Sequence, residues 1–137
     1  MAGNIRLEVV TPQKEVVKEE AQIVVAPGVL GEFGVLVGHT PFMTSLNVGT
    51  VRYTDAQGQE HSVFVSGGFA EALPDRVTVL AESAERRRDI DIDRAKAALD
   101  RAQKRIDDKS RDIDYLRAKM ALKRALHRIQ LAGGRRS

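Results

Sequence analysis

The fold is decided across one stretch of the sequence, RVTVLAESAERRRDIDIDRA, which covers residues 76–95. All 15 Val and all 4 Pro of the chain lie before residue 85, whereas residues 85–132 contain no Gly, Pro, Val or Thr. Val and Thr favour strands, while Ala, Leu, Arg and Lys favour helices. The sequence therefore predicts an α+β protein, with a β-sandwich over residues 1–84 followed by an antiparallel two-helix hairpin over residues 85–137.

Short apolar runs separated by turn residues fill the first part. Asp55-Ala-Gln-Gly-Gln and Pro74-Asp75 both lie between such runs, so each is predicted to form a turn. About nine short strands with frequent turns are typical of an all-β sandwich or a flattened barrel. No helical pattern follows Ser66-Gly67-Gly68, so we interpret it as a bulge or tight turn between strands rather than a phosphate loop.

Two apolar stripes at helical spacing run through the second part. They consist of Ile92, Ala95, Leu99, Ala102 and Ile106, and of Tyr115, Ala118, Leu122, Ala125 and Ile129. We expect Asp89 or Asp91 to cap the first helix and Asp112 or Asp114 the second, with a bend over residues 107–112 and an end at Gly133-Gly134. Because alanine buries little area, the seam between the helices is predicted to be weak enough to open.

Composition excludes several kinds of site. The chain has 137 residues and no Cys, which excludes disulfides, thiolate metal sites and a cysteine nucleophile. Its three histidines, His39, His61 and His127, are far apart, so we expect no metal centre. The N-terminus lacks the pattern of a signal peptide, and Pro27 and several glycines break the most apolar stretch, so we expect no insertion into a membrane.

Charge differs sharply between the two parts, with a net charge of −5 over residues 1–84 and +8 over residues 85–137. Three arginines repeat at the same spacing on one face of each predicted helix: Arg94, Arg101 and Arg105, and then Arg117, Arg124 and Arg128. Two such rows of arginines could bind a polyphosphate between them. Alternatively, they form a basic face that is solvated or that binds an acidic partner. Nucleic-acid binding is disfavoured because Tyr115 is the only aromatic residue in this part.

Three segments in this order carry a family resemblance: Gly31-Glu32-Phe33-Gly34-Val35-Leu36-Val37-Gly38-His39-Thr40-Pro41, Val65-Ser66-Gly67-Gly68-Phe69 and Val77-Thr78-Val79-Leu80-Ala81. With the Ala-rich hairpin, they make the whole chain resemble the epsilon subunits of bacterial F-type ATP synthases. Val37 stands where that family usually has Pro. The resemblance implies a ten-stranded sandwich at the foot of the rotor in a subunit without catalytic activity. It also implies contacts with the gamma subunit and the c-ring, with Glu32 and His39 at that interface.

Some members of this family bind ATP in the folded hairpin through an Ile/Leu-Asp-x-x-Arg-Ala motif, which Ile90-Asp91-Ile92-Asp93-Arg94-Ala95 matches. The resemblance implies an ATP site made of Glu85, Ile90, Asp91, Arg94, Ala95, Arg101, Arg124 and Arg128. ATP would be a regulatory ligand, with no cofactor required. Asp93 lies inside the motif and would repel phosphate.

A regulatory mechanism is expected from the weak seam. The opened helices would form a rod of about 45 residues, about 65 Å long, that reaches the alpha and beta catalytic subunits and blocks ATP hydrolysis. ATP would favour the closed hairpin. The resemblance places the protein peripherally on the cytoplasmic face of the bacterial cell membrane. Two other interpretations are a free-standing nucleotide-binding sensor and a nucleic-acid-binding protein with a basic tail.

Overall fold

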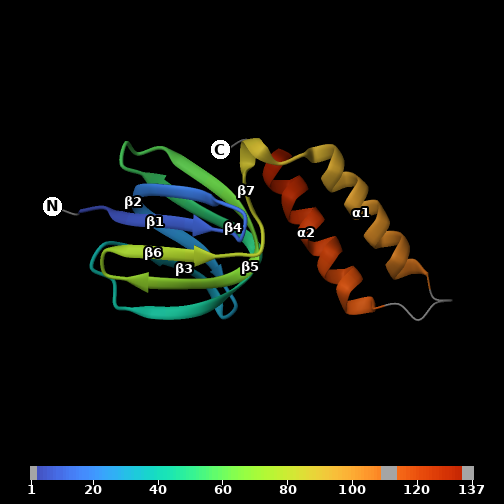
Figure 1. The fold of residues 1–137 in the computed structure, drawn as a ribbon, viewed down its shortest axis with the longest axis horizontal. Helices are drawn as coiled ribbons and strands as arrows, with labels where there is room; N and C mark the ends of the chain where they lie inside the picture. Colours follow the sequence, from blue (N-terminus) through green and yellow to red (C-terminus); the bar gives the residue numbers. More distant parts are fainter. Residues whose placement is uncertain (1–2, 109–113, 134–137) are drawn as a thin grey trace.

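The computed structural model describes residues 3–108 and 114–133. Its β part contains β1 (Ile5–Val10), β2 (Glu15–Gly28), β3 (Gly31–Val35), β4 (Phe42–Asp55), β5 (Glu60–Leu73), β6 (Arg76–Leu80) and β7 (Ala84–Arg86). The 3₁₀ helix η1 (Arg87–Asp89) leads into α1 (Ile92–Asp107), and α2 (Tyr115–Gly133) follows. The strands form one lobe and the two helices form a hairpin beside it, as Figure 1 shows. The predicted α+β organisation is confirmed.

The expected count of ten strands was wrong, because the described residues form seven. Strands β2, β4 and β5 each run for 14 residues, so each covers the length of two ordinary strands. Register shifts bend β2 against β4 between Ala21 and Ile23 and between Val25 and Gly28 without ending the strand. A long bent strand therefore replaces two short ones.

Strand β1 closes the sheet on itself. The hydrogen-bonded order is β1-β6-β5-β4-β2-β3, and β1 also pairs with β2. The β1–β2 pairing is antiparallel, whereas β1 runs parallel to β6, with Leu7 opposite Val77 and Val9 opposite Val79. The β part is thus a flattened barrel in which alternate residues point inward.

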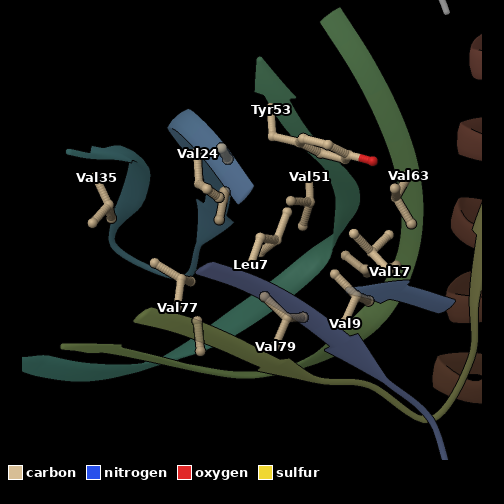
Figure 2. Packing of buried hydrophobic residues seen from close by; sticks show 14 of the residues in the cluster. Leu7, Val9, Val17, Val24, Val35, Val51, Tyr53, Val63, Val77 and Val79 are labelled. Atoms are coloured by element: carbon tan, nitrogen blue, oxygen red, sulfur yellow. The ribbon is translucent and has the colours of Figure 1, made fainter. Parts of the chain in front are cut away.

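Valine dominates the interior of this barrel. Figure 2 shows Leu7 of β1, Val24 of β2, Val51 of β4, and Val77 and Val79 of β6 converging, and each is fully buried. Branched aliphatic side chains suit such a core because they pack well on a pleated surface and lose little rotamer freedom there. The core is confined to the β part, so the hairpin contributes little to it.

Ser66-Gly67-Gly68 lies inside β5 rather than between strands. At this point β5 changes its second neighbour, because Val65 pairs with Ala84 of β7 whereas Phe69 pairs with Leu80 of β6. Both glycines have positive φ, 101° at Gly67 and 121° at Gly68, which is the irregular backbone expected of a bulge.

Most of the predicted turns and caps are confirmed. The β4–β5 turn follows Asp55, whose Oδ1 accepts the N–H groups of Gln57 and Gln59, both at 2.9 Å. The β5–β6 turn falls at residues 74–75. Asp91, not Asp89, caps α1 by accepting the Arg94 N–H at 3.0 Å, and Asp114 accepts the Arg117 N–H at 3.0 Å. The other expected cap, residue 112, and most of the expected bend lie outside the described residues.

The hairpin meets the barrel through α2. This helix packs against β4 and β5, while α1 packs against α2 on the other side (Figure 1). The alanines Ala95, Ala102, Ala118 and Ala125 are all buried, as the predicted seam requires. Strand β7 crosses the predicted border between residues 84 and 85, since it pairs with β5 as far as Arg86. The β part therefore extends two residues further than expected.

Candidate functional site

Arg128 on α2 is the main polar link between the hairpin and the barrel. Its Nε donates to Oε1 of Glu85 at 2.5 Å, and Nη2 lies 3.4 Å from the Ser83 hydroxyl oxygen. The guanidinium carbon stands 4.4 Å from the centroid of the Phe64 ring, a cation–π arrangement. Both side chains of the ion pair are largely buried, with 24% of Arg128 and 30% of Glu85 exposed. Partial burial makes this pair stronger than one on the open surface.

A small apolar cluster lies next to this ion pair. Val48, Phe64 and Ile90 are buried together, and Leu131 and Ala132 of α2 pack against them. This cluster is separate from the valine core of the barrel. Five side chains of this size bury only a limited apolar area, so the docked position of α2 is held weakly.

The structure places the predicted ATP-site residues in two groups. Glu85, Ile90 and Arg128 meet where α2 docks, with Arg124 half-buried one turn before Arg128 on α2. Asp91 is used as the cap of α1, and Ala95 is buried in the helix seam. Arg94 and Arg101 are exposed on α1.

Of the predicted interface residues, Glu32 lies in β3 beside the β2–β3 turn, and His39 lies in the loop between β3 and β4. Glu32 is exposed and forms an ion pair with Arg52 across 2.7 Å. The His39 ring stacks at a tilt against Phe42 with centroids 4.8 Å apart, and Phe42 meets Phe33 edge-on at 5.0 Å. Among the described residues, Nδ1 of His39 is a buried side-chain atom without a hydrogen-bond partner.

Large apolar side chains are exposed near these residues. They include Val29, Leu30, Leu36, Val37 and Met43. Leu30, at the β2–β3 turn, is 97% exposed. Val29 and Leu30 lie at the β2–β3 turn, whereas Leu36 and Val37 follow β3. Exposed apolar side chains around one strand are typical of a protein-binding surface.

A partly buried polar network lies on the side of the barrel next to β7. The Tyr53 hydroxyl donates to Glu19 at 2.6 Å and accepts from Nη1 of Arg86 at 3.0 Å. Burial and the hydrogen bond to Glu19 raise the pKa of Tyr53 to about 12. The His61 ring stacks on Tyr53, and its Nε2 lies 2.8 Å from Asp55, whose pKa this hydrogen bond lowers.

Two hollows flank the docked helix. One, of ≈ 660 Å³, lies between the β2–β3 turn and α2, and its charged lining residues are Glu32, Arg52 and Lys123, with His127 beside them. Burial first, and the neighbouring Lys123 charge second, lower the pKa of His127. The other hollow, of ≈ 720 Å³, lies where β7 leads into η1.

The described residues hold neither a cluster of metal-ligating side chains nor a helix that could span a membrane. Over residues 3–108 and 114–133, no three His, Asp or Glu side chains gather as a cation site would require. Neither of the two helices, as described, has the length and apolar character needed to cross a membrane.

Comparison with known families covers nearly the whole chain. Residues 4–87 match the family described as "ATP synthase, Delta/Epsilon chain, beta-sandwich domain", and residues 88–133 match "ATP synthase, Delta/Epsilon chain, long alpha-helix domain". The chain belongs to the epsilon-chain family of ATP synthase. The resemblance stated from the sequence is thereby confirmed.

Individual epsilon chains are similar over most of their length. The ATP synthase epsilon chain of Desulfosudis oleivorans is 66% identical over 107 residues, which are 78% of this chain and 80% of the relative. That of Desulfatibacillum aliphaticivorans is 63% identical over 109 residues, 80% of this chain and 77% of the relative.

Solved structures share the fold at low identity. A chain of the Euglena gracilis mitochondrial ATP synthase, solved as OSCP/F1/c-ring, has a TM-score of 0.78 at 21% identity and covers 92% of this chain and 79% of its own. A chain of the central stalk and c-ring of the Tetrahymena thermophila enzyme has a TM-score of 0.57 at 14% identity, over 93% of this chain and 92% of its own.

Sequence reasoning missed two features of this epsilon chain. It did not place Phe64 and Ser83 beside Arg128, because Phe64 in β5 and Ser83 between β6 and β7 are far from α2 along the chain. It also gave no role to the run Arg86-Arg87-Arg88, although three consecutive arginines at the border between the two parts are visible in the sequence.

Proposed function

We propose that this epsilon chain is a non-catalytic central-stalk subunit of a proton-translocating F-type ATP synthase that joins the gamma subunit to the c-ring. The exposed apolar side chains around β3, with Glu32 and His39, form the docking surface. A partner that docks on this surface covers Leu30, which is 97% exposed. The complex holds the subunit peripherally on the cytoplasmic face of the bacterial membrane.

We further propose that the hairpin is a movable inhibitor of ATP hydrolysis. The observation that carries this is the weak docking of α2, which depends on the Glu85–Arg128 ion pair and a small apolar cluster. The alanine seam between α1 and α2 also buries little area. Opening of both contacts produces a long basic rod that binds acidic surfaces of the alpha and beta subunits.

ATP is the ligand proposed to favour the docked hairpin. Arg128 and the half-buried Arg124 follow one another on the face of α2 near the barrel, and Arg94 and Arg101 are exposed on α1. Guanidinium groups bind phosphate oxygens with paired hydrogen bonds. Bound phosphates compete with Glu85 for Arg128, so ATP replaces one contact of the docked state with several. A ligand that binds only this state shifts the population toward it.

Calorimetric titration of the isolated subunit with ATP tests the nucleotide site. The double variant Arg124→Ala/Arg128→Ala is expected to weaken binding at least a hundredfold, since each charge-assisted contact contributes about 1.5–3 kcal/mol. The matched control is Lys119→Ala/Lys123→Ala, which removes the same charge from other faces of α2. Equal losses in both variants would mean general electrostatics rather than a site.

Assembled ATP synthase tests the inhibition. An epsilon chain that ends at Arg88 keeps all seven strands and lacks the hairpin. Enzyme assembled with it is expected to hydrolyse ATP faster than enzyme with the full chain while ATP synthesis is retained. Unchanged hydrolysis would exclude the hairpin as an inhibitor, and failure to assemble would show that the hairpin is needed for docking to the rotor.

A further inference from the structure

Three consecutive arginines, Arg86, Arg87 and Arg88, line the ≈ 720 Å³ hollow at the junction of barrel and hairpin. The other lining residues are Gln59, Glu60, His61, Ser62, Ile90, Ile92 and Ala132. None of these arginines belongs to the ATP site proposed above, which shares only Ile90 with this lining. The hollow is therefore a second arginine-lined region of the protein.

The course of β5 explains why a hollow forms here. Strand β7 pairs with β5 only from Ala84, opposite Val65, to Arg86, opposite Val63. Beyond that point residues 60–62 of β5 pair with β4 on one side and have no β7 residue on the other. The chain turns away through η1 at this place, so the space beside His61 and Ser62 stays open, with arginines along its border.

The charge of the lining is predominantly positive. Glu60 is the only carboxylate among the lining residues, against three arginines. Arg86 is held in position by the Val16 carbonyl, the Tyr53 hydroxyl and Glu19, and 19% of its side chain is exposed. His61 is likewise held by Asp55. Arg88 is exposed at the border of the hollow, and Arg87 belongs to the same lining.

We propose that this hollow binds a small phosphate-bearing anion at a site separate from the arginines of α1 and α2. A cavity of this size suits a small molecule. Arginine is the side chain best suited to phosphate, because its planar donors match two oxygens at once. Ser62 and Gln59 add neutral hydrogen-bonding groups to the same lining.

Occupation of this site also favours the docked hairpin. The barrel supplies residues 59–62, the linker supplies Arg87 and Arg88, and α2 supplies Ala132. The site is therefore complete only while α2 is docked. An anion that binds the docked form but not the open form stabilises the docked form by mass action. Binding itself does not depend on the proposed inhibition.

Titration of the full-length subunit with inorganic pyrophosphate, followed by calorimetry and ³¹P NMR, tests the proposal. We expect Arg87→Ala/Arg88→Ala to weaken pyrophosphate binding at least tenfold and Arg88→Ala to weaken it less. The matched control, Arg105→Ala/Arg117→Ala, removes two exposed arginines elsewhere on the hairpin and is expected to bind as the unmodified chain does. Circular dichroism checks that each variant is folded.

Three outcomes would overturn the proposal: no binding to the unmodified chain, equal weakening in the control, or weakening by Arg124→Ala/Arg128→Ala but not by Arg87→Ala/Arg88→Ala. Parallel titrations with ATP and with inorganic phosphate separate a nucleotide from a free anion as the source of the phosphate. The two proposals can be disproved separately. If the ATP site does not exist, the unmodified chain does not bind ATP. The anion proposal depends instead on whether Arg87→Ala/Arg88→Ala weakens pyrophosphate binding.

Discussion

Glu85 and Arg86 are neighbours on β7, and their side chains engage different parts of the molecule. Glu85 accepts a hydrogen bond from Arg128 of α2, whereas Arg86 donates to Tyr53 inside the β part. Successive side chains of a strand point to opposite faces, so one short strand fixes the hairpin on one side and the polar network on the other. This arrangement separates the proposed nucleotide site from the proposed anion site, and it makes Glu85 the natural place to test docking.

Replacement of Glu85 by Gln is expected to loosen α2 without harming the barrel. The change removes the charge of the ion pair, so the half-buried Arg128 keeps Phe64, Ser83 and only a weaker, neutral acceptor at position 85. A loss of about 1–2 kcal/mol is expected for a charge-assisted contact that is partly exposed. Hydrogen exchange of α2 amides should then become about 5–30 times faster, with exchange in β4 and β5 unchanged. Glu82→Gln, at an exposed glutamate, serves as the control; identical α2 rates in both variants would contradict the docking role.

Docking of α2 is expected to weaken as the pH falls. In the docked state the pKa of His127 lies below its ordinary value of 6.5, chiefly because of burial. The open state therefore binds more protons, so His127 stabilises docking fully above pH 6.5 and loses that contribution as the pH falls through the lowered pKa. The other charged groups beside it are Lys123 on α2, with Arg52 and Glu32 on the barrel, and the last two are paired with each other.

Energy transfer between dyes on the barrel and on α1, measured from pH 7.5 to 5.5, checks this expectation. The unmodified chain should show a larger dye separation at low pH, and His127→Gln should flatten the profile. His61→Gln alters the histidine that is paired with Asp55 and should leave the profile in place. A profile that survives in His127→Gln would assign the pH dependence to another group.

Strand β7 is expected to be part of the folded barrel despite its helix-like composition. Ala84 is buried in the core, and Ser83 exchanges hydrogen bonds with Ser66. A chain that ends at Glu82 loses these contacts and should be less stable than one that ends at Arg88 by roughly 2–4 kcal/mol. Urea unfolding of both shortened chains provides the comparison. Equal midpoints would show that β7 is only an extension of the hairpin.

Gly68 is expected to tolerate no side chain. A Cβ at this position would lie 2.0 Å from the Leu80 carbonyl oxygen, in a backbone that also has a φ of 121°. Gly68→Ala should therefore lose about 3–5 kcal/mol of stability or fail to fold. Gly58 also has a positive φ, 86°, but a Cβ there meets nothing within 4 Å, so Gly58→Ala should lose only about 1 kcal/mol. Similar urea midpoints for the two variants would contradict this account.

The sequence was informative wherever local chemistry decides the structure. The change from Val and Gly to Ala and Leu marked the β and α parts, and Asp91 and Asp114 were among the predicted caps because a cap depends on residues three positions apart. The strand count was wrong because a bend inside β2, or the bulge at Gly67-Gly68, has the same composition as a turn that ends a strand. Local pattern does not distinguish the two.

Long-range contacts account for what was missed at the site. Glu85 and Arg128 were both expected to bind a ligand, but nothing in their spacing, 43 residues apart, indicates that they pair with each other. The position of Phe64 under the Arg128 guanidinium likewise depends on where α2 packs against β5. Such contacts are set by the packing of the two parts.

The parallel pairing of β1 with β6 has a consequence for how this chain acquires its fold. Arg6 pairs with Arg76, 70 residues later, and the barrel cannot close before this pairing forms. Each of the two helices, in contrast, forms hydrogen bonds between residues that are close in the sequence. Distant pairings are slow because a long loop must be closed first. During synthesis on the ribosome, one edge of β1 therefore stays unpaired until β6 has emerged. The barrel closes only when more than half of the chain has been made.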